Sequence, residues 1–224
     1  MIWSMKQVRS FLPEFFARLG MSSDSASIDS LVALFRFVST RSAFVAQKTL
    51  YGYVKTRMGS RYPRMFEDDI FIASIDIAKM HVFAACLSDL SLFAVSRLRR
   101  GGLDDAASRA LAERCFDIGL ADNDEQARRV EAFSPADAKA AFARRLAFID
   151  WDAGVEGATL FTASPAALYE WAPIAPNLKR HDKEIVENSI RFTWRDMRTQ
   201  FDKRLDIAAI IAELKGQEPT IGSA

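Results

Sequence analysis

The sequence predicts an all-α protein, a single compact bundle of about seven or eight helices. Apolar residues recur every three or four positions over most of the chain, which is the spacing that lines one face of an α-helix. No segment shows the strict apolar–polar alternation typical of a half-buried strand. The chain has 224 residues, 50% of them hydrophobic, enough to bury a substantial core. We therefore expect one domain over residues 1–215 and a frayed tail over residues 216–224.

The first two helical segments follow from their apolar faces. Residues 8–19 carry an amphipathic pattern whose middle is weakened by Pro13. A second helical region runs over residues 25–59, begins at Ser25 or Ser27 as the cap and ends at a glycine. Ser39–Ser42 and Gly52 are candidate breaks within it, because serine and glycine weaken a helix interior.

A long helix is predicted over Glu67–Arg100, separated from the preceding region by Pro63. It begins with acidic residues and ends with arginines before two glycines, in agreement with the helix dipole and with glycine C-caps. Its apolar stretch, Ile70–Val95, is interrupted by charged residues, and the longest run without Asp, Glu, Lys or Arg is nine residues, Met80–Ser88. A membrane span needs ~18 apolar residues, so we interpret this segment as a core helix and expect no transmembrane segment.

Capping residues place the remaining helices. Aspartate or serine at a helix start, with proline in the first turn, is typical of N-termini, and glycine follows C-termini. The expected segments are Asp104 to Ile118, ended by Gly119; a short helix begun by a capping box of Asp122 and Glu125; Ser134 to Asp150; Ser164 to Trp171; and a last amphipathic helix over His181–Lys215.

Positive charge is concentrated near the N-terminus although the net charge is only +1. Between Ser30 and Phe66 the chain has seven cations and no acid. Three aromatic residues recur every seven positions in this segment, and each is followed four positions later by a cation: Phe37 by Arg41, Phe44 by Lys48 and Tyr51 by Lys55. On a helix these residues form aromatic–cation pairs along one face.

We predict that this segment forms a docking surface for an anionic partner, either an acidic protein surface or another anion. The predicted binding residues are Arg41, Lys48, Tyr51, Lys55, Arg57, Arg61 and Arg64. A net charge near zero disfavours a dedicated nucleic-acid binder. Peripheral contact with anionic lipid, through the first helix and these cations, is an alternative. A further alternative is that the acid-rich residues 103–132 neutralise the cations within the molecule.

Candidate catalytic residues are few. Only His81 and His181 supply an imidazole, and the sequence lacks zinc-site spacing, a nucleophile elbow and a phosphate-binding loop. His81 is flanked by alanines within an apolar helix, which favours a structural role. We expect no cofactor and no metal. The alternative is a hydrolase in which one of these histidines acts with a serine from another segment.

The cysteine pattern and the N-terminus predict a cytoplasmic location. Cys86 and Cys115 are isolated from each other and form no CxxC pair, which indicates neither a disulfide framework nor a zinc site. The first residues lack the cationic start, apolar block and small-residue cleavage site of a secretory signal.

One segment carries a family resemblance. Residues Ser39–Gly59, followed by Arg61-Tyr62-Pro63, resemble a small group of uncharacterised bacterial proteins, and the similarity continues through Glu67-Asp68-Asp69 and the helix after it. The resemblance implies a bacterial origin and a discrete family. Some members of that group carry an esterase label, but this chain has no hydrolase motif onto which catalytic residues can be carried over.

The sequence therefore predicts a non-catalytic binding protein, such as an adaptor or assembly factor, that uses a basic–aromatic helical face. The alternatives are the histidine-dependent, esterase-like hydrolase and the peripheral membrane protein. The sequence does not specify the oligomeric state.

Overall fold

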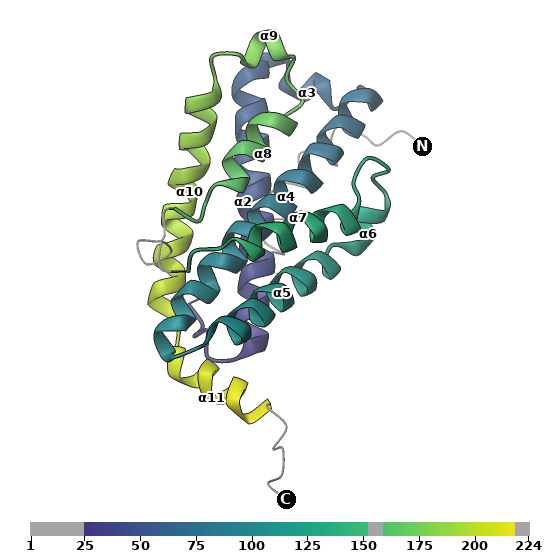
Figure 1. Ribbon diagram of the computed structural model, residues 1–224. Helices are drawn as coiled ribbons and strands as arrows, with labels where there is room; N and C mark the ends of the chain where they lie inside the picture. Colours follow the sequence, from purple (N-terminus) through teal and green to yellow (C-terminus); the bar gives the residue numbers. More distant parts are fainter. Residues whose placement is uncertain (1–24, 152–158, 218–224) are drawn as a thin grey trace, which may run out of the picture.

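The computed structural model describes residues 25–151 and 159–217, which form the predicted all-α bundle (Figure 1). The main helices are α2 (Leu31–Met58), α4 (Asp69–Leu98), α5 (Asp105–Ala121), α7 (Pro135–Ala147), α8 (Ala163–Trp171), α10 (Lys183–Arg204) and α11 (Ile207–Gln217). Shorter helical turns are η1 (Gly59–Arg61), α3 (Tyr62–Met65), η2 (Arg99–Gly101), α6 (Asp124–Arg128) and α9 (Pro176–Lys179). The helix expected over residues 8–19 and most of the expected tail lie outside the described residues.

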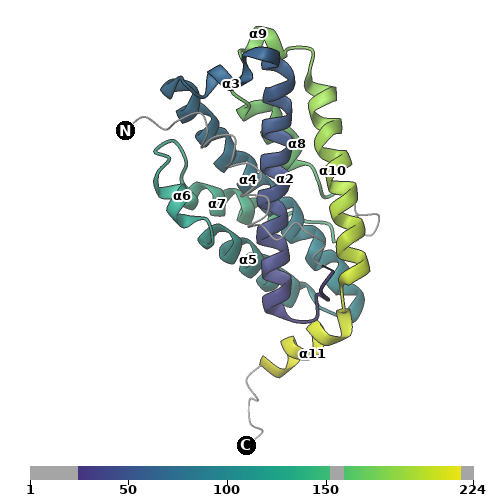
Figure 2. The same ribbon diagram turned by 180° about the vertical axis from the view of Figure 1, so that it is seen from behind.

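The central helix of the bundle is α4. Helices α2, α5 and α8 pack against it, and α10 packs against α2 and α8 (Figures 1 and 2). Every residue of α4 from Cys86 to Leu98 is buried, as expected for a helix surrounded by others. Residues Asp69–Gly101 are also long and apolar enough to cross a membrane: one 18-residue window has a mean hydropathy of 1.8, and 44% of that window is buried inside the structure. The core helices of globular proteins can have the same length and composition, so these two properties alone are weak evidence for a membrane span.

Helix α2 is capped and continued differently from the prediction. Ser30, rather than Ser25 or Ser27, accepts the capping hydrogen bond, from the backbone nitrogen of Ala33. The helix then runs without a break through Ser39–Ser42 and Gly52 to Met58. Tertiary packing explains the continuity, because both serines of the first candidate break are buried in the bundle.

The predicted end of α5 at Gly119 is wrong, and packing gives the reason. The helix continues to Ala121. A Cβ atom at Gly119 would lie 2.5 Å from Leu87 Cδ1, so the glycine permits the close approach of α5 to α4 rather than ending the helix. The next helix, α6, begins after Asn123, whose side chain donates to the Gly119 carbonyl, and not at the predicted Asp122–Glu125 box.

The predicted last helix, His181–Lys215, is two helices. Helix α10 ends at Arg204, Leu205 is extended, and α11 starts at Ile207. The break is held by Ile28, whose backbone nitrogen donates to the Arg204 carbonyl at 2.8 Å and whose carbonyl accepts from the nitrogen of Asp206 at 3.0 Å. The sequence pattern missed the break because the apolar period continues through it, while the chain segment that stabilises it lies far away along the sequence.

The buried carboxylate of Asp89, on α4, contacts two other helices, α7 and α8. It accepts hydrogen bonds from the backbone nitrogens of Ala163 and Ser164, at 3.2 and 2.8 Å, and from Ser164 Oγ at 2.6 Å. Arg145 of α7 forms an ion pair with it at 2.6 Å. Burial raises the pKa of the Asp89 carboxyl, and Arg145 and Ser164 act in the opposite direction. Helix α8 is therefore capped by Asp89, not by Ser164 as predicted, and Ser164 Oγ accepts from Trp194 Nε1 of α10.

Candidate partner-binding site

Arg41 was expected to face outward, and the structure buries it. Its side chain is 5% exposed, and the guanidinium lies 5.5 Å from the centroid of the Phe37 ring. Phe37 packs in turn against Phe201 of α10, with ring centroids 5.3 Å apart. The four-residue spacing does bring the cation over the ring, but this level of α2 is covered by neighbouring helices. Arg41 therefore belongs to the interior packing of α2 and not to an external surface.

Arg57 is exposed, and it is neutralised within the molecule. Its Nε atom lies 2.5 Å from Asp182 Oδ2, and its Nη2 atom donates to Asp182 Oδ1 and to the Leu178 carbonyl. Tyr53 donates to the same carboxylate at 2.7 Å. Burial and this hydrogen bond raise the pKa of Tyr53 to about 12. Arg57 thus joins α2 to the turn between α9 and α10, which is a structural role.

Tyr51 faces the α3–α4 side of α2. It is half-buried, its ring centroid lies 6.4 Å from that of Phe66, and burial raises the pKa of its hydroxyl. The Tyr51 ring therefore takes part in packing between α2 and the α3–α4 segment, whereas Lys55, four residues later, is exposed.

The remaining predicted cations do form an exposed, unneutralised set. These residues are Lys48, Lys55, Arg61 and Arg64, and no carboxylate in residues 25–151 or 159–217 forms an ion pair with any of them. The acid-rich residues 103–132 pair with other cations, for example Asp117 with Lys139 and Asp105 with Arg99. Within the described part of the chain, the acids of that region therefore leave these four charges uncompensated.

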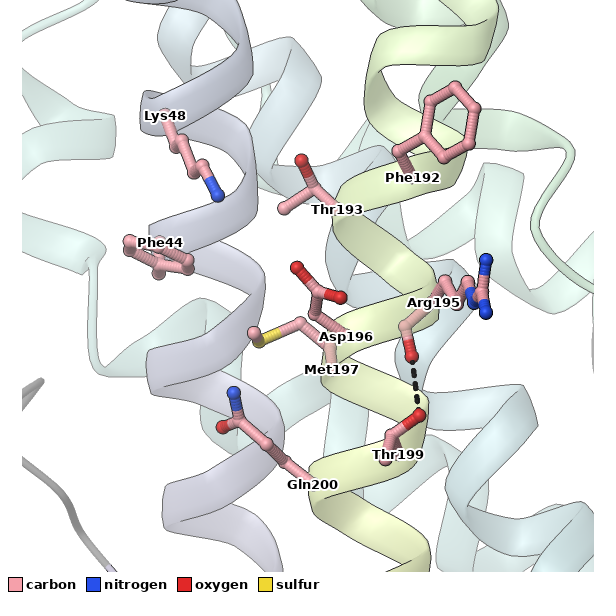
Figure 3. A pocket seen from close by; sticks show the side chains of 9 residues that line it. All are labelled: Phe44, Lys48, Phe192, Thr193, Arg195, Asp196, Met197, Thr199 and Gln200. Carbon is pink, nitrogen blue, oxygen red and sulfur yellow. Dashed lines mark hydrogen bonds between the residues drawn. The ribbon is translucent and has the colours of Figure 1, made fainter.

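Lys48 lies at the edge of a groove between α2 and α10 (Figure 3). This α2–α10 groove has a volume of about 850 Å³ and is lined by Phe44, Lys48, Phe192, Thr193, Arg195, Asp196, Met197, Thr199 and Gln200. Its floor is apolar, formed by the nearly buried Phe44 and Met197. The Lys48 ammonium lies 5.4 Å from the Phe44 ring centroid, and the Phe192 side chain, on the other wall, is 67% exposed.

The same chemistry continues beyond the groove toward α9. Helices α2 and α10 run in opposite directions, so residues later in α2 lie beside residues earlier in α10 (Figure 2). Lys55 follows Lys48 by two helical turns on α2, and Ile185 precedes Phe192 by two turns on α10. Ile185 is 68% exposed. Lys55 therefore continues the line of exposed positive charge along α2, and Ile185 continues the line of exposed apolar side chains along α10.

The α10 half of this surface was missed by the sequence analysis. Ile185 and Phe192 are large apolar residues, seven positions apart, on the face of α10 opposite its buried residues. That spacing of exposed apolar residues on an otherwise charged helix face was the available signal. Only the structure shows that Phe192 and Lys48 line the same groove.

The two candidate catalytic histidines lie in different surroundings. His81 stacks on Trp171, with parallel rings and centroids 3.5 Å apart, and its Nε2 atom lies 3.1 Å from the Ala132 carbonyl. Burial lowers its pKa. His181 is exposed in the turn between α9 and α10. Among the described residues, neither imidazole hydrogen-bonds a hydroxyl or a thiol, so the hydrolase alternative remains a prediction.

The cysteines and the acidic residues suggest no reactive centre in the part of the chain that the structure covers. Cys86 and Cys115 are both buried and free, and burial raises the pKa of both thiols, to about 12 for Cys115. A protonated, buried thiol is a poor nucleophile. In residues 25–151 and 159–217, no group of three or more His, Cys, Asp or Glu side chains is arranged to hold a metal ion.

Comparison with protein-family models, with curated proteins and with solved structures found no match to this chain. The resemblance to the esterase-labelled bacterial group therefore stays a prediction, as does the cytoplasmic location. The fold and the α2–α10 groove define the protein as an all-α helical bundle with a partly apolar, partly basic external surface.

Proposed function

We propose that the protein is a non-catalytic adaptor or assembly factor that binds an acidic, amphipathic helical segment of a protein partner along α2 and α10. The observation that carries this proposal is the groove between α2 and α10, which combines an apolar floor with the exposed, unneutralised Lys48 on one wall and the exposed Phe192 on the other. Lys48 and, two turns further along α2, Lys55 supply the charge, and Phe192 supplies the apolar contact.

The dimensions support a helix as the ligand. Lys48 and Lys55 are separated by two helical turns, which is about 10.5 Å. A partner helix of about three turns, with carboxylates seven residues apart on one edge, spans this distance. Its apolar residues would contact Phe192 and the floor formed by Phe44 and Met197, which is the usual arrangement of a helix bound in a groove.

The charge distribution supports a protein partner over a nucleic acid. Asp196 lines the groove beside Lys48 and would repel a continuous row of phosphates. A helix that carries separate carboxylates can place them next to the lysines and away from Asp196. Because the lysines are exposed, their contribution to binding decreases with increasing salt.

Site-specific photo-crosslinking in the native host tests the position and the partner class. A benzophenone amino acid replaces Phe192 in one variant and Phe148 in the control, since Phe148 is 91% exposed at the end of α7. We expect a protein cross-link only from position 192, and a linked peptide with an acidic amphipathic helical pattern. Equal cross-links from both positions, or cross-links to nucleic acid or lipid, would contradict the proposal.

Charge reversal tests the lysines against a matched control. K48E with K55E should weaken binding of the cross-linked peptide by about 2 kcal/mol, roughly thirtyfold, at low salt. K203E with K215E makes the same change of charge at exposed lysines near the other end of the bundle and should leave the affinity unchanged. Equal affinities for the two double variants would refute the role of Lys48 and Lys55.

A further inference from the structure

A second cavity, the α4–α7 cavity, shares no residue with the α2–α10 groove. It has a volume of about 560 Å³, within the range typical of sites for small molecules. Alanines on the two facing helices create the space, because their side chains are too short to fill it. These alanines are Ala84 and Ala85 on α4 and Ala138 and Ala141 on α7.

The walls of the α4–α7 cavity are fixed by contacts that do not depend on a ligand. Phe142 stacks on Phe116 of α5, with parallel rings and centroids 4.3 Å apart. Arg145 donates to Ser88 Oγ at 2.8 Å and forms the ion pair with Asp89 that joins α7 to α4. The cavity is therefore formed before any ligand enters, which reduces the entropic cost of binding.

Two polar groups on its walls have unused hydrogen-bonding capacity. Ser88 is only 6% exposed, and its hydroxyl accepts a bond from Arg145 but finds no acceptor for its own proton among the described residues. His81 donates from Nε2 to the Ala132 carbonyl, which leaves Nδ1 as a hydrogen-bond acceptor without a partner in the described part of the chain. The two residues are two helical turns apart, about 10.5 Å.

The interior of the cavity carries no uncompensated charge. The Arg145 guanidinium is neutralised by Asp89, and its four Nη hydrogens bond Ser88, Asp89, Leu160 and Thr162. The other charged residues of the lining, Glu131, Asp137 and Arg144, are exposed at the rim. An ionised ligand would therefore lose its hydration without gaining a partner inside.

We infer that the α4–α7 cavity binds a small uncharged molecule with a flat or extended apolar body, a hydrogen-bond acceptor at one end and a donor at the other. The acceptor of the ligand receives a hydrogen bond from the Ser88 hydroxyl, and its donor forms a hydrogen bond to His81 Nδ1. The apolar body lies against the four alanines and the Phe142 ring. This inference is independent of partner binding at the α2–α10 groove.

A fluorescence titration tests this inference. The probe is hydroxyacetylnaphthalene, which has a hydroxyl and a ketone at opposite ends of two fused rings and whose emission shifts to the blue in an apolar site. Its charged analogue is hydroxynaphthoate. We expect saturable binding of the neutral probe and at least tenfold weaker binding of the carboxylate. Absence of saturable binding by the neutral probe, or tighter binding of hydroxynaphthoate, overturns the inference.

Variants place the probe within the cavity. A141L adds volume at an exposed position of the rim and should weaken binding at least tenfold, whereas A140L, at the neighbouring exposed alanine outside the lining, should have no effect. S88A should weaken binding about fivefold through the loss of one hydrogen bond. Unchanged helical circular dichroism shows that each variant folds. Equal affinities for A141L and A140L contradict the assigned position.

Discussion

Removal of the Asp89 carboxylate should be among the most destabilising single changes in this protein. Asp89→Ala leaves Arg145 without its counter-ion and removes the acceptor for both backbone nitrogens at the start of α8. Loss of one partner from a buried ion pair costs about 3–5 kcal/mol, a range that already includes much of the cost of the unpaired donors. We therefore expect the free energy of unfolding to decrease by about 4 kcal/mol. This is a large fraction of the roughly 5–15 kcal/mol by which a typical domain is stable.

Urea unfolding followed by circular dichroism measures this loss. A change of about 4 kcal/mol corresponds to a decrease in Tm of roughly 8–16 °C for a chain of this size. Tryptophan fluorescence adds a local signal, because Trp194 donates to the Ser164 hydroxyl that Asp89 accepts from. The matched control is Asp117→Ala, which removes an exposed carboxylate paired with Lys139 and should cost less than about 1 kcal/mol.

A double variant separates the charge from the cap. Arg145→Met combined with Asp89→Ala removes both charges, so the double variant should lose less stability than the sum of the two single variants. A loss below about 1 kcal/mol for Asp89→Ala alone would refute the argument that this carboxylate holds α4, α7 and α8 together.

Three further predictions follow from individual positions. Gly52→Ala should raise the free energy of unfolding by about 0.5–1 kcal/mol, because Gly52 is exposed within a helix and a Cβ there meets no atom within 4 Å. Gly119→Ala should lower the free energy of unfolding by about 1–3 kcal/mol, because a Cβ there would overlap Leu87. Both are measured by urea unfolding, and a similar effect at the two glycines would contradict the packing argument. Arg41→Glu should reduce the free energy of unfolding by about 3 kcal/mol or more, whereas Lys48→Glu should change it by less than about 0.5 kcal/mol, because only Arg41 is buried. Equal thermal stabilities of these two variants would contradict the burial of Arg41. The folded state holds the pKa of His81 below its ordinary value of 6.5, so its contribution to stability is complete above that pH and is lost as the pH falls toward the lowered pKa; His81→Phe, measured across the same pH range, should show a smaller decrease.

The candidate surface was only partly predictable from the sequence. The absence of acids between residues 30 and 66 located the exposed cations Lys48, Lys55, Arg61 and Arg64. The same pattern also selected Arg41, since a helical repeat does not report which side of a helix neighbouring helices cover. Partners that lie far away in the sequence decided burial and pairing, as the contact between Arg57 and Asp182 shows.

Local chemistry determined the fold class and several helix ends. The three-to-four residue apolar period gave the helices, and Asp104 and Ser134 cap α5 and α7 through hydrogen bonds that reach only three residues along the chain. These features depend on neighbouring residues, so the sequence by itself determined them.

Tertiary structure decided the features that require contact between distant segments. Gly119 lies within a helix because Leu87 packs against it, and Ile28 divides the last helical pattern into α10 and α11. Asp89, which belongs to α4, caps the start of α8. The α2–α10 groove and the α4–α7 cavity also form only where two helices pack side by side. In each case a close approach between residues far apart in the sequence changes which local conformation has the lowest free energy, and no periodic pattern within one segment contains that information.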